Sequence, residues 1–547
     1  MTTSEHHTDI LIVGGGIAGI SAALDLLDAG RSVTIVDRDT EDNFGGLAKW
    51  AFGGMFFVNT KEQRRSGIRD SVDLALRDWY AYAEFTDDEI WGRKWADQYV
   101  HLCTPHSYHW LKQKGLSFFP VVNWTERGLL KPGNSVPRFH IVWGTGWGLM
   151  QELIYQLRNH ASADKLHLIF QARVHDLILT NQRVTGVHGT YEGSSKEFTI
   201  TAEQTIVATG GINGSIERVK ANWYQPWGDP PETILNGAHP FAVGDLHDAT
   251  LQANGQVVNL DKQWNYAAGI RHYQPRKKDH GLSLVPCKSA LWLNYRGERM
   301  GPMPLITAYD TRYLVERICQ EPVKYSWQVL NYAIAKKEFA ISGSEHNDHF
   351  RNKKFLPFVW QTLVTGNTKL VDKVIDKCED VVIAQSVDEL VDKMNALTGE
   401  NQVEGDLVRD AISQYDAHID RGPALFNDEQ LRRIAHARRY RGDRSRTCKF
   451  QKIDDPKARP LIAIREFILS RKSLGGIQTN LESQVLSQPD TNGQQNPIPG
   501  LYAAGEAAGF GGGGMHGHRS LEGTFLGGCI ISARIAAASI LGKKLNA

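Results

Sequence analysis

Three glycines near the start of the chain have the spacing of a dinucleotide-binding loop. Gly14, Gly16 and Gly19 follow the apolar run at 10–13 as G-x-G-x-x-G, and an apolar helical pattern comes next. Such glycines let the backbone approach a pyrophosphate at a helix N-terminus, where the helix dipole supplies partial positive charge. Asp37 follows Gly16 by 21 residues, where a carboxylate can accept from ribose hydroxyls. The spacing predicts a dinucleotide site that fits a nicotinamide and a flavin cofactor equally well.

A second glycine-rich signal lies at the other end of the chain. Gly500 to Glu506 read GLYAAGE, and four of the five residues from Phe510 to Gly514 are glycine. Such a run suggests mobility or the close approach of a flat ligand. An apolar helical pattern begins at Leu526. We expect the two ends of the chain to meet around one dinucleotide.

The elements that must position these loops are those of an α/β protein. Strand patterns at 10–13 and 32–36 flank the first helix, and period-two patterns between 166 and 209 predict a meander that returns to the same sheet. The segment 266–455 is less regular and combines a two-strand signal at 292–300 with helices between 310 and 440. We therefore predict a Rossmann-type domain formed by residues 1–265 and 456–547, with residues 266–455 inserted into it.

Composition argues against several classes of protein. A chain of 547 residues is long enough for two domains, and its balanced charge, 62 basic and 61 acidic residues, gives no case for a nucleic-acid or anionic-membrane partner. The six cysteines form no CxxC pair, which favours reduced thiols over disulfides or an iron–sulfur site. No stretch approaches eighteen apolar residues and the N-terminus lacks signal-peptide features. We expect a soluble, cytoplasmic protein.

Several motifs in order resemble the fumarate reductase and 3-ketosteroid dehydrogenase family of FAD-dependent oxidoreductases over nearly the whole chain. Besides the first fingerprint they are the GG…GG loop at 45–54, VATGG at 207–211, SLGG at 473–476 and GLYAAGE at 500–506. The resemblance implies a Rossmann-type FAD-binding domain with an inserted, mobile α+β capping domain. The cofactor-binding residues it implies are Gly14, Gly16, Gly19, Asp37, Gly45, Gly46, Gly53, Gly54, Val174, Thr209, Gly210, Gly505, Glu506 and Leu526.

The same resemblance implies how FAD is held. Leu47 stands where some relatives attach FAD covalently through a histidine, so we expect non-covalent FAD, and no metal. Glu506 is expected near the ribityl hydroxyls. Gly527 and Gly528 are expected to open the C-terminal helix, whose N-terminus would face the pyrimidine end of the flavin and stabilise negative charge there.

The family transfers a hydride between flavin N5 and a carbon beside a carbonyl or carboxyl group, while a second group moves a proton. Fumarate reductases grip two carboxylates with arginine and histidine. Here Asn265 and the Arg471-Lys472 pair replace two of those histidines, and Ser520 replaces an arginine. Each lost charge-assisted hydrogen bond is worth about 1.5–3 kcal/mol. Fumarate is therefore disfavoured unless Arg471, Lys472 and Arg519 compensate.

One short segment resembles both branches of the family. Tyr309-Asp310 resembles the P-Y-D-Q segment of ketosteroid dehydrogenases, whose tyrosine is catalytic. Thr311-Arg312 matches the T-R-D segment in which fumarate reductases place a proton-delivering arginine. A tyrosine of ordinary pKa near 10 needs its anion stabilised to act as a base at neutral pH. Arg312 could provide that stabilisation.

Three C-terminal residues complete the predicted catalytic set. Arg519 aligns with the carbonyl-polarising tyrosine of ketosteroid dehydrogenases, Gly523 aligns with their backbone donor, and His518 is a candidate proton relay. With Tyr309 as base, we predict an FAD-dependent dehydrogenase that introduces a C=C bond beside the carbonyl of a bulky, apolar substrate. The alternatives are a reductase of an activated alkene with Arg312 as acid, an electron-transfer flavoprotein subunit, and a flavin-binding protein without catalysis. The sequence does not identify the electron acceptor.

Overall fold

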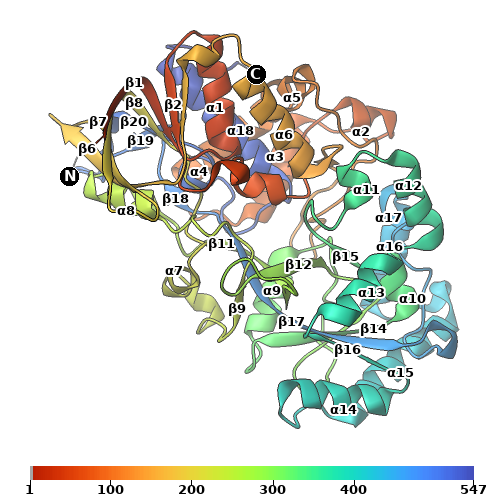
Figure 1. Cartoon of the computed structure of the whole chain (residues 1–547). Helices are drawn as coiled ribbons and strands as arrows, with labels where there is room; N and C mark the ends of the chain where they lie inside the picture. The colour runs from red at the N-terminus through yellow and green to blue at the C-terminus, as the bar shows by residue number, and fades with distance from the viewer. Residues whose placement is uncertain (1–3, 547) are drawn as a thin grey trace.

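Two large sheets organise the chain. The computed structural model describes residues 4–546 and arranges them in two lobes, each built on an eight-stranded sheet. Figure 1 shows the first lobe at the upper left with both chain termini, and the second lobe at the lower right.

The first sheet is the expected nucleotide-binding sheet. Strands β1, β2, β5, β8 and β20 run in parallel in the order β20-β8-β1-β2-β5, while β19, β7 and β6 add antiparallel strands. The predicted meander and the return of the C-terminal segment to this sheet are confirmed. The strands are β1 (Ser4–Val13), β2 (Val33–Val36), β5 (Leu166–Ile169), β6 (Ala172–Thr180), β7 (Arg183–Tyr191), β8 (Glu197–Val207), β19 (Gln484–Leu486) and β20 (Pro497–Ala503).

Apolar helices from both chain ends pack together on this sheet. The helix α1 (Ile17–Asp28) contacts both α6 (Thr145–Arg158) and α18 (Thr524–Ile540). Helix α18 begins two residues before the predicted start, so Gly527 is its fourth residue and Gly528 its fifth, and neither opens it. A Cβ atom on Gly527 would lie 2.3 Å from the hydroxyl oxygen of Tyr99. Close packing against α4 (Ile90–Leu102) therefore explains that glycine.

The second sheet is centred on one long strand. Strand β17 pairs with β9, β11, β14 and β16. Because β9 and β17 fall outside residues 266–455, this sheet extends beyond the predicted insertion at both ends. Of the two-strand signal at 292–300, the first strand ends at Leu293, and Arg299 forms a single antiparallel bridge back to it. The strands are β9 (Ile234–Asn236), β11 (Gln263–Arg271), β12 (Gly281–Val285), β13 (Leu291–Leu293), β14 (Tyr325–Asn331), β15 (Ala340–Ile341), β16 (Val381–Ala384) and β17 (Leu461–Ser473).

Most of the remaining helices surround the second sheet, and residues 60–115 of the first lobe are also mostly helical. Two small ribbons, β3 (Gly54–Phe56) with β4 (Phe139–Ile141) and β10 (Val257–Val258) with β18 (Gly476–Ile477), complete the strands. The helices are α2 (Lys61–Arg65), α3 (Val72–Ala83), α5 (His109–Gln113), α7 (Ile216–Ala221), α8 (Asp245–Gln252), α9 (Thr311–Cys319), α10 (Tyr332–Glu338), α11 (Asp348–Arg351), α12 (Phe355–Trp360), α13 (Thr368–Lys377), α14 (Val387–Thr398), α15 (Gly405–Arg421), α16 (Glu429–Arg439) and α17 (Arg441–Arg444).

The glycine run near the C-terminus is packed tightly. Phe510 and the four glycines that follow are all buried. Cβ atoms on Gly511 and Gly512 would lie 2.4 and 2.6 Å from the ring of Trp95. Contact with this indole explains Gly511 and Gly512, and Gly513 packs against Val258 in the same way, with a Cβ that would lie 2.5 Å from Cγ2.

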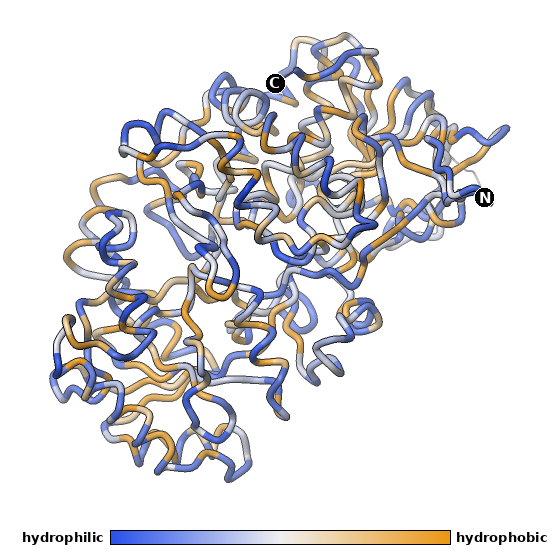
Figure 2. The backbone as a smooth tube through the Cα atoms, turned by 180° about the vertical axis from the view of Figure 1, so that it is seen from behind, coloured by the Kyte–Doolittle hydropathy of each residue, from blue (hydrophilic) through white to orange (hydrophobic). Residues whose placement is uncertain are grey.

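Each lobe has its own apolar core, which Figure 2 shows as hydrophobic segments running through both lobes. Trp79 and Trp95 belong to the core of the first lobe, and Trp327 belongs to that of the second. Within residues 4–546, no helix combines the length and apolar character needed to cross a membrane.

One buried carboxyl group in β17 should make stability depend on pH. Glu466 is fully buried, and neither of its side-chain oxygens has a hydrogen-bond partner within residues 4–546. Burial raises the pKa of Glu466 well above its ordinary value of 4.5. The folded chain therefore keeps a proton that the unfolded chain loses, and this group lowers stability as the pH rises above that value.

We expect Glu466→Gln to raise the free energy of unfolding, because glutamine needs no proton to stay neutral. The gain should grow by up to about 1.4 kcal/mol for each pH unit above 4.5, until the folded carboxyl itself ionises. Urea unfolding of wild type and Glu466→Gln across a series of pH values measures this gain, with the exposed Glu400→Gln variant as the control. A gain that does not change with pH would contradict this account.

Candidate active site

A long cavity lies at the carboxyl ends of the parallel strands of the first sheet. Its walls come from the loops after β1, β2 and β8, from β6, from the turn after β20 and from the start of α18. This edge of an open parallel sheet is where such folds bind ligands. We call it the nucleotide cavity.

Most of the residues predicted to bind the cofactor line this cavity. Three glycines, Gly19, Gly45 and Gly505, do not line it and instead contact residues that do. A Cβ on Gly19 would lie 2.1 Å from the carbonyl oxygen of Gly14, and one on Gly505 would lie 2.9 Å from Cβ of Ala18. The amide of Gly45 donates to the first glycine loop. The predicted residues that do line the cavity are Gly14, Gly16, Asp37, Gly46, Gly53, Gly54, Val174, Thr209, Gly210, Glu506 and Leu526.

The geometry of the first loop fits a dinucleotide. A Cβ on Gly16 would meet no atom of residues 4–546 within 4 Å, so the loop leaves an open cradle at the N-terminus of α1. Asp37 is held in place because Oδ2 accepts from the amide of Gly15 at 2.6 Å and Oδ1 accepts from that of Asp39 at 2.8 Å. An anion in the cradle would meet the positive end of the helix dipole. Leu47 also lines the cavity.

Two further features suit the flavin half of FAD. Glu506 accepts a hydrogen bond from the amide of Ser473 at 2.9 Å, and burial raises the pKa of Glu506 to about 7. Gly523, the N-cap of α18, lines the cavity together with Phe525 in the first turn. The first amides of a helix have no acceptor within the helix, so this end of α18 offers donors to a bound ligand.

A second cavity adjoins the nucleotide cavity and extends into the second lobe. Five residues line both cavities, so they form the wall at which the two meet: Phe52, Phe139, Tyr266, Ser342 and Glu522. Much of the rest of the lining is apolar, which suits a bulky apolar molecule. These apolar residues include Trp124, Ile141, Leu284, Val285, Pro286, Leu314 and Ile341.

The shared wall carries a cluster of hydrogen-bonded titratable groups. The hydroxyl of Tyr266 donates to Oε1 of Glu522, which also accepts from Nε1 of Trp264 at 2.9 Å. Nζ of Lys472 donates to the hydroxyl oxygen of Tyr266 at 3.2 Å. The pairing of β11 with β17 brings Tyr266 and Lys472 together although they are 206 residues apart. The cluster therefore joins strands of the second sheet to the loop before α18.

The contacts of this cluster provide a path for a proton, and its electrostatics keep the Tyr266 hydroxyl protonated at neutral pH. Burial raises the pKa of Tyr266 well above its ordinary value, and the Glu522 carboxylate raises it further. Burial lowers the pKa of Lys472 to about 8. A protonated hydroxyl thus lies between a carboxylate that can accept its proton and an ammonium that can stabilise negative charge on its oxygen.

Of the five predicted catalytic residues, Gly523 alone lines either of these two cavities within residues 4–546. Tyr309 is buried; its hydroxyl donates to the carbonyl oxygen of Arg433 at 2.9 Å and lies 3.0 Å from Nδ1 of His436. Arg519 forms ion pairs with Asp310 at 2.6 Å and with Glu84 at 3.0 Å.

Arg312 and His518 lie beside that ion-pair cluster. The guanidinium of Arg312 donates to the carbonyl oxygen of His518 at 3.2 Å and stacks over the rings of Tyr224 and Trp227. The ring of His518 packs edge-on against Tyr224, with centroids 5.1 Å apart. These contacts tie α9 to the C-terminal loop. Buried pairs of this kind are costly to break, which suits a structural contact between the lobes.

The sequence contains a signal for the shared wall. Asn265 and Lys472 marked positions at which this chain departs from the fumarate reductase pattern, and Tyr266 is the next residue after Asn265. Glu522 lies directly before Gly523. Departures from a family pattern that gather in one place indicate that the substrate groups differ.

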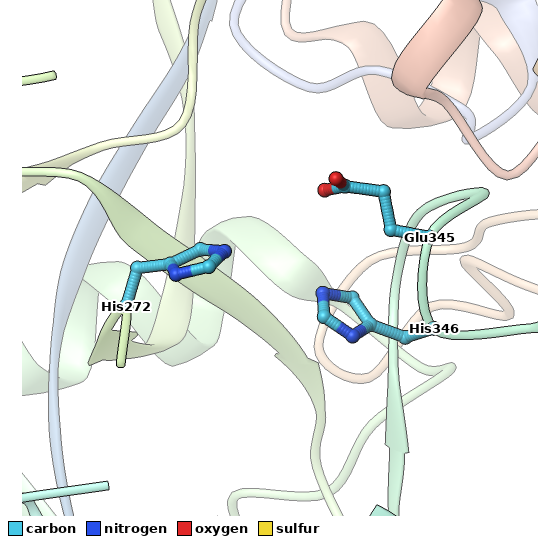
Figure 3. A group of neighbouring side chains, drawn as sticks. All are labelled: His272, Glu345 and His346. Carbon is cyan, nitrogen blue, oxygen red and sulfur yellow. The ribbon is translucent and has the colours of Figure 1, made fainter. Parts of the chain in front are cut away.

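One group of side chains in the described chain has the composition of a metal site. The possible ligand atoms of His272, Glu345 and His346 lie within 4.8 Å of one another. Figure 3 shows the three side chains. Protein donors already engage two of them, because Glu345 accepts from Arg276 at 2.7 Å and Nδ1 of His272 accepts from the amide of Gln274 at 2.9 Å. We assign no metal to this group.

The chain matches a family model described as FAD binding domain over residues 9–526. It is 41% identical over 546 residues to a protein of Mycobacterium tuberculosis described as a KsdD-like steroid dehydrogenase, covering 96% of this chain and 94% of that protein.

Two solved structures share the fold over 99% of this chain. One is a 3-ketosteroid-Δ4-(5α)-dehydrogenase from Rhodococcus jostii in complex with 4-androstene-3,17-dione, with a TM-score of 0.65, 19% identity and 98% of that chain covered. The other is the open conformation of a flavocytochrome c3 fumarate reductase, with a TM-score of 0.67, 20% identity and 79% of that chain covered.

Proposed function

Since this chain belongs to the FAD binding domain family, we propose that it is an FAD-dependent dehydrogenase that introduces a C=C bond beside the ketone of a 3-ketosteroid. The observation that carries this proposal is the shared wall, where an apolar cavity meets the nucleotide cavity at Tyr266 and Glu522. The similarity to KsdD-like steroid dehydrogenases supports the same substrate class.

FAD in the nucleotide cavity supplies the acceptor for a hydride. The cradle at Gly16 would hold the pyrophosphate, Asp37 a ribose and Glu506 the ribityl hydroxyls. With Leu47 in place of the histidine that attaches FAD in some relatives, we propose that FAD is bound non-covalently. The N-terminal amides of α18 would lie against the flavin half.

The residues of the shared wall would move the proton. The hydroxyl oxygen of Tyr266 takes a proton from the carbon beside the ketone and passes its own proton to the Glu522 carboxylate. Lys472 stabilises the negative charge that develops on the tyrosine oxygen. The substrate loses this proton and one hydride. A separate oxidant must then remove the two electrons from the reduced flavin. The amide of Gly523 is our candidate for polarising the ketone oxygen.

The second lobe would act as a capping domain over the site, formed by the segment 266–455 with the flanking strands β9 and β17. We also propose that the protein works in the cytoplasm, because its six cysteines form no disulfide within residues 4–546.

Anaerobic mixing of the purified holoprotein with candidate substrates tests the reaction. We expect a 3-ketosteroid to bleach the oxidised flavin, whereas succinate should not. A second arm reduces the flavin first and adds fumarate or an unsaturated ketone. Rapid reoxidation there, together with no bleaching by any saturated ketone, would mean that the protein is an alkene reductase.

A further inference from the structure

The second cavity has a charged end as well as an apolar middle. Lys288, Glu338, Asp443 and Arg446 line it, and none of these four residues of the described chain lines the nucleotide cavity. The charged end is therefore separate from the shared wall, where the reaction would take place. Nothing in the proposed chemistry accounts for these groups.

The two carboxylates at this end are already satisfied by protein donors. Glu338 accepts from the amide of Ser289 at 3.0 Å, from the hydroxyl of Ser289 at 2.7 Å and from the amide of Cys448 at 2.6 Å. Asp443 pairs with Arg127 and lies 3.5 Å from Nζ of Lys288. Neither carboxylate needs a ligand.

The cations, in contrast, do not all have a protein partner in the described chain for their N–H groups. The guanidinium of Arg446 makes no hydrogen bond or ion pair with residues 4–546, and Nη1 of the buried Arg127 also lacks a partner. Arg446 keeps a large accessible surface although burial within the fold lowers its pKa, so this surface faces the cavity. Lys288 and Arg127 both pair with Asp443, so Arg446 is the cation lining the charged end that has no protein partner within residues 4–546.

We propose that this charged end binds a carboxylate of the substrate, with Arg446 as the main contact and Lys288 beside it. A planar guanidinium pairs well with a carboxylate through two parallel hydrogen bonds. The inference rests on the proposed function, and it narrows the substrate class to elongated apolar ketones that carry an acidic group at the end remote from the ketone. A neutral ketosteroid would leave the Arg446 guanidinium without a partner.

A matched pair of ligands tests this. We compare a 3-ketosteroid that carries a carboxylate on its C17 side chain with the methyl ester of the same compound, using the holoprotein. The dissociation constant is read from the change in the flavin spectrum, and turnover is read with an artificial electron acceptor. We expect the acid to bind about 10- to 100-fold more tightly than the ester.

Variants then assign this preference to one side chain. Arg446→Gln should remove most of the preference for the acid and leave the ester unchanged, and Arg446→Lys should keep part of it. Arg441→Gln is the control and should behave as wild type, because Arg441 is an exposed arginine at the start of α17, five residues before Arg446, and lines neither cavity. FAD content and circular dichroism check that each variant is folded.

The outcomes separate this inference from the proposed function. Equal affinity of the wild-type protein for acid and ester, with the ester turned over, overturns the carboxylate site and leaves the dehydrogenase standing. Absence of bleaching with both compounds overturns the proposed function, while the ratio of the two dissociation constants still decides whether the carboxylate site exists. A preference for the acid that survives Arg446→Gln assigns the site to other residues and contradicts the proposal.

Discussion

Tyr266→Phe should lower kcat by about 10²- to 10⁴-fold while the protein keeps its FAD. The substitution removes the hydroxyl that lies between Lys472 and Glu522 in the shared wall, and leaves the ring in place. Without it, the carbon beside the ketone has no hydroxyl through which its proton can reach Glu522. Single-turnover bleaching by a 3-ketosteroid under anaerobic conditions measures the loss directly, because it contains no step of reoxidation.

A matched tyrosine serves as the control. Tyr309→Phe removes a hydroxyl that contacts Arg433 and His436 outside both cavities, so we expect a change in kcat of less than about threefold. Glu522→Gln keeps the shape of the wall but removes the proton acceptor, so its loss should resemble that of Tyr266→Phe. Full activity of Tyr266→Phe together with an inactive Tyr309→Phe would return the catalytic role to the residue that the sequence motif suggested.

The nucleotide-binding sheet could be predicted because its signals are local. The spacing of Gly14, Gly16 and Gly19, the apolar strand before them and the helix after them lie within one short segment. Each later motif, such as the one ending at Glu506, also combines a strand with a tight turn. Local sequence determines such units, and the family resemblance supplied their order.

The chemistry of the shared wall could not be predicted in the same way, because it depends on long-range pairing. Lys472 is the Cα partner of Trp264, and the register of β11 against β17 shifts between Trp264 and Asn265. The contact between Tyr266 and Lys472 depends on this register. A one-residue slip turns a strand side chain to the opposite face, so no local pattern states which residues meet. Tyr309 illustrates the converse: the motif around it is local, but packing against α16 turns its hydroxyl towards His436.

The same distinction applies to glycines, whose spacing alone does not say which of them a ligand touches. Gly19 and Gly16 belong to one motif, but their surroundings differ. A Cβ on Gly19 would lie 2.1 Å from the carbonyl oxygen of Gly14, whereas one on Gly16 would meet no described atom within 4 Å. Gly16 also has a φ of −77°, which any residue adopts. A methyl group on residue 16 would therefore neither strain the backbone nor clash with the chain. It would clash only with a ligand bound in the cradle.

Gly16→Ala should therefore weaken FAD binding by about 10- to 100-fold without destabilising the FAD-free protein, because the methyl group would occupy the space of the pyrophosphate. Gly19→Ala should destabilise the FAD-free protein itself, since its methyl group would collide with the backbone of the loop. Fluorescence titration of the FAD-free variants with FAD measures the first effect, and thermal unfolding without FAD measures the second. Wild type and the exposed Glu400→Gln variant set the baseline for both measurements. Gly67→Ala is not used as a control, because Gly67 has a positive φ that alanine would adopt only with strain. If Gly16→Ala binds FAD as tightly as wild type, the pyrophosphate does not lie in this cradle. The first glycine loop would then not be the pyrophosphate site of the nucleotide cavity.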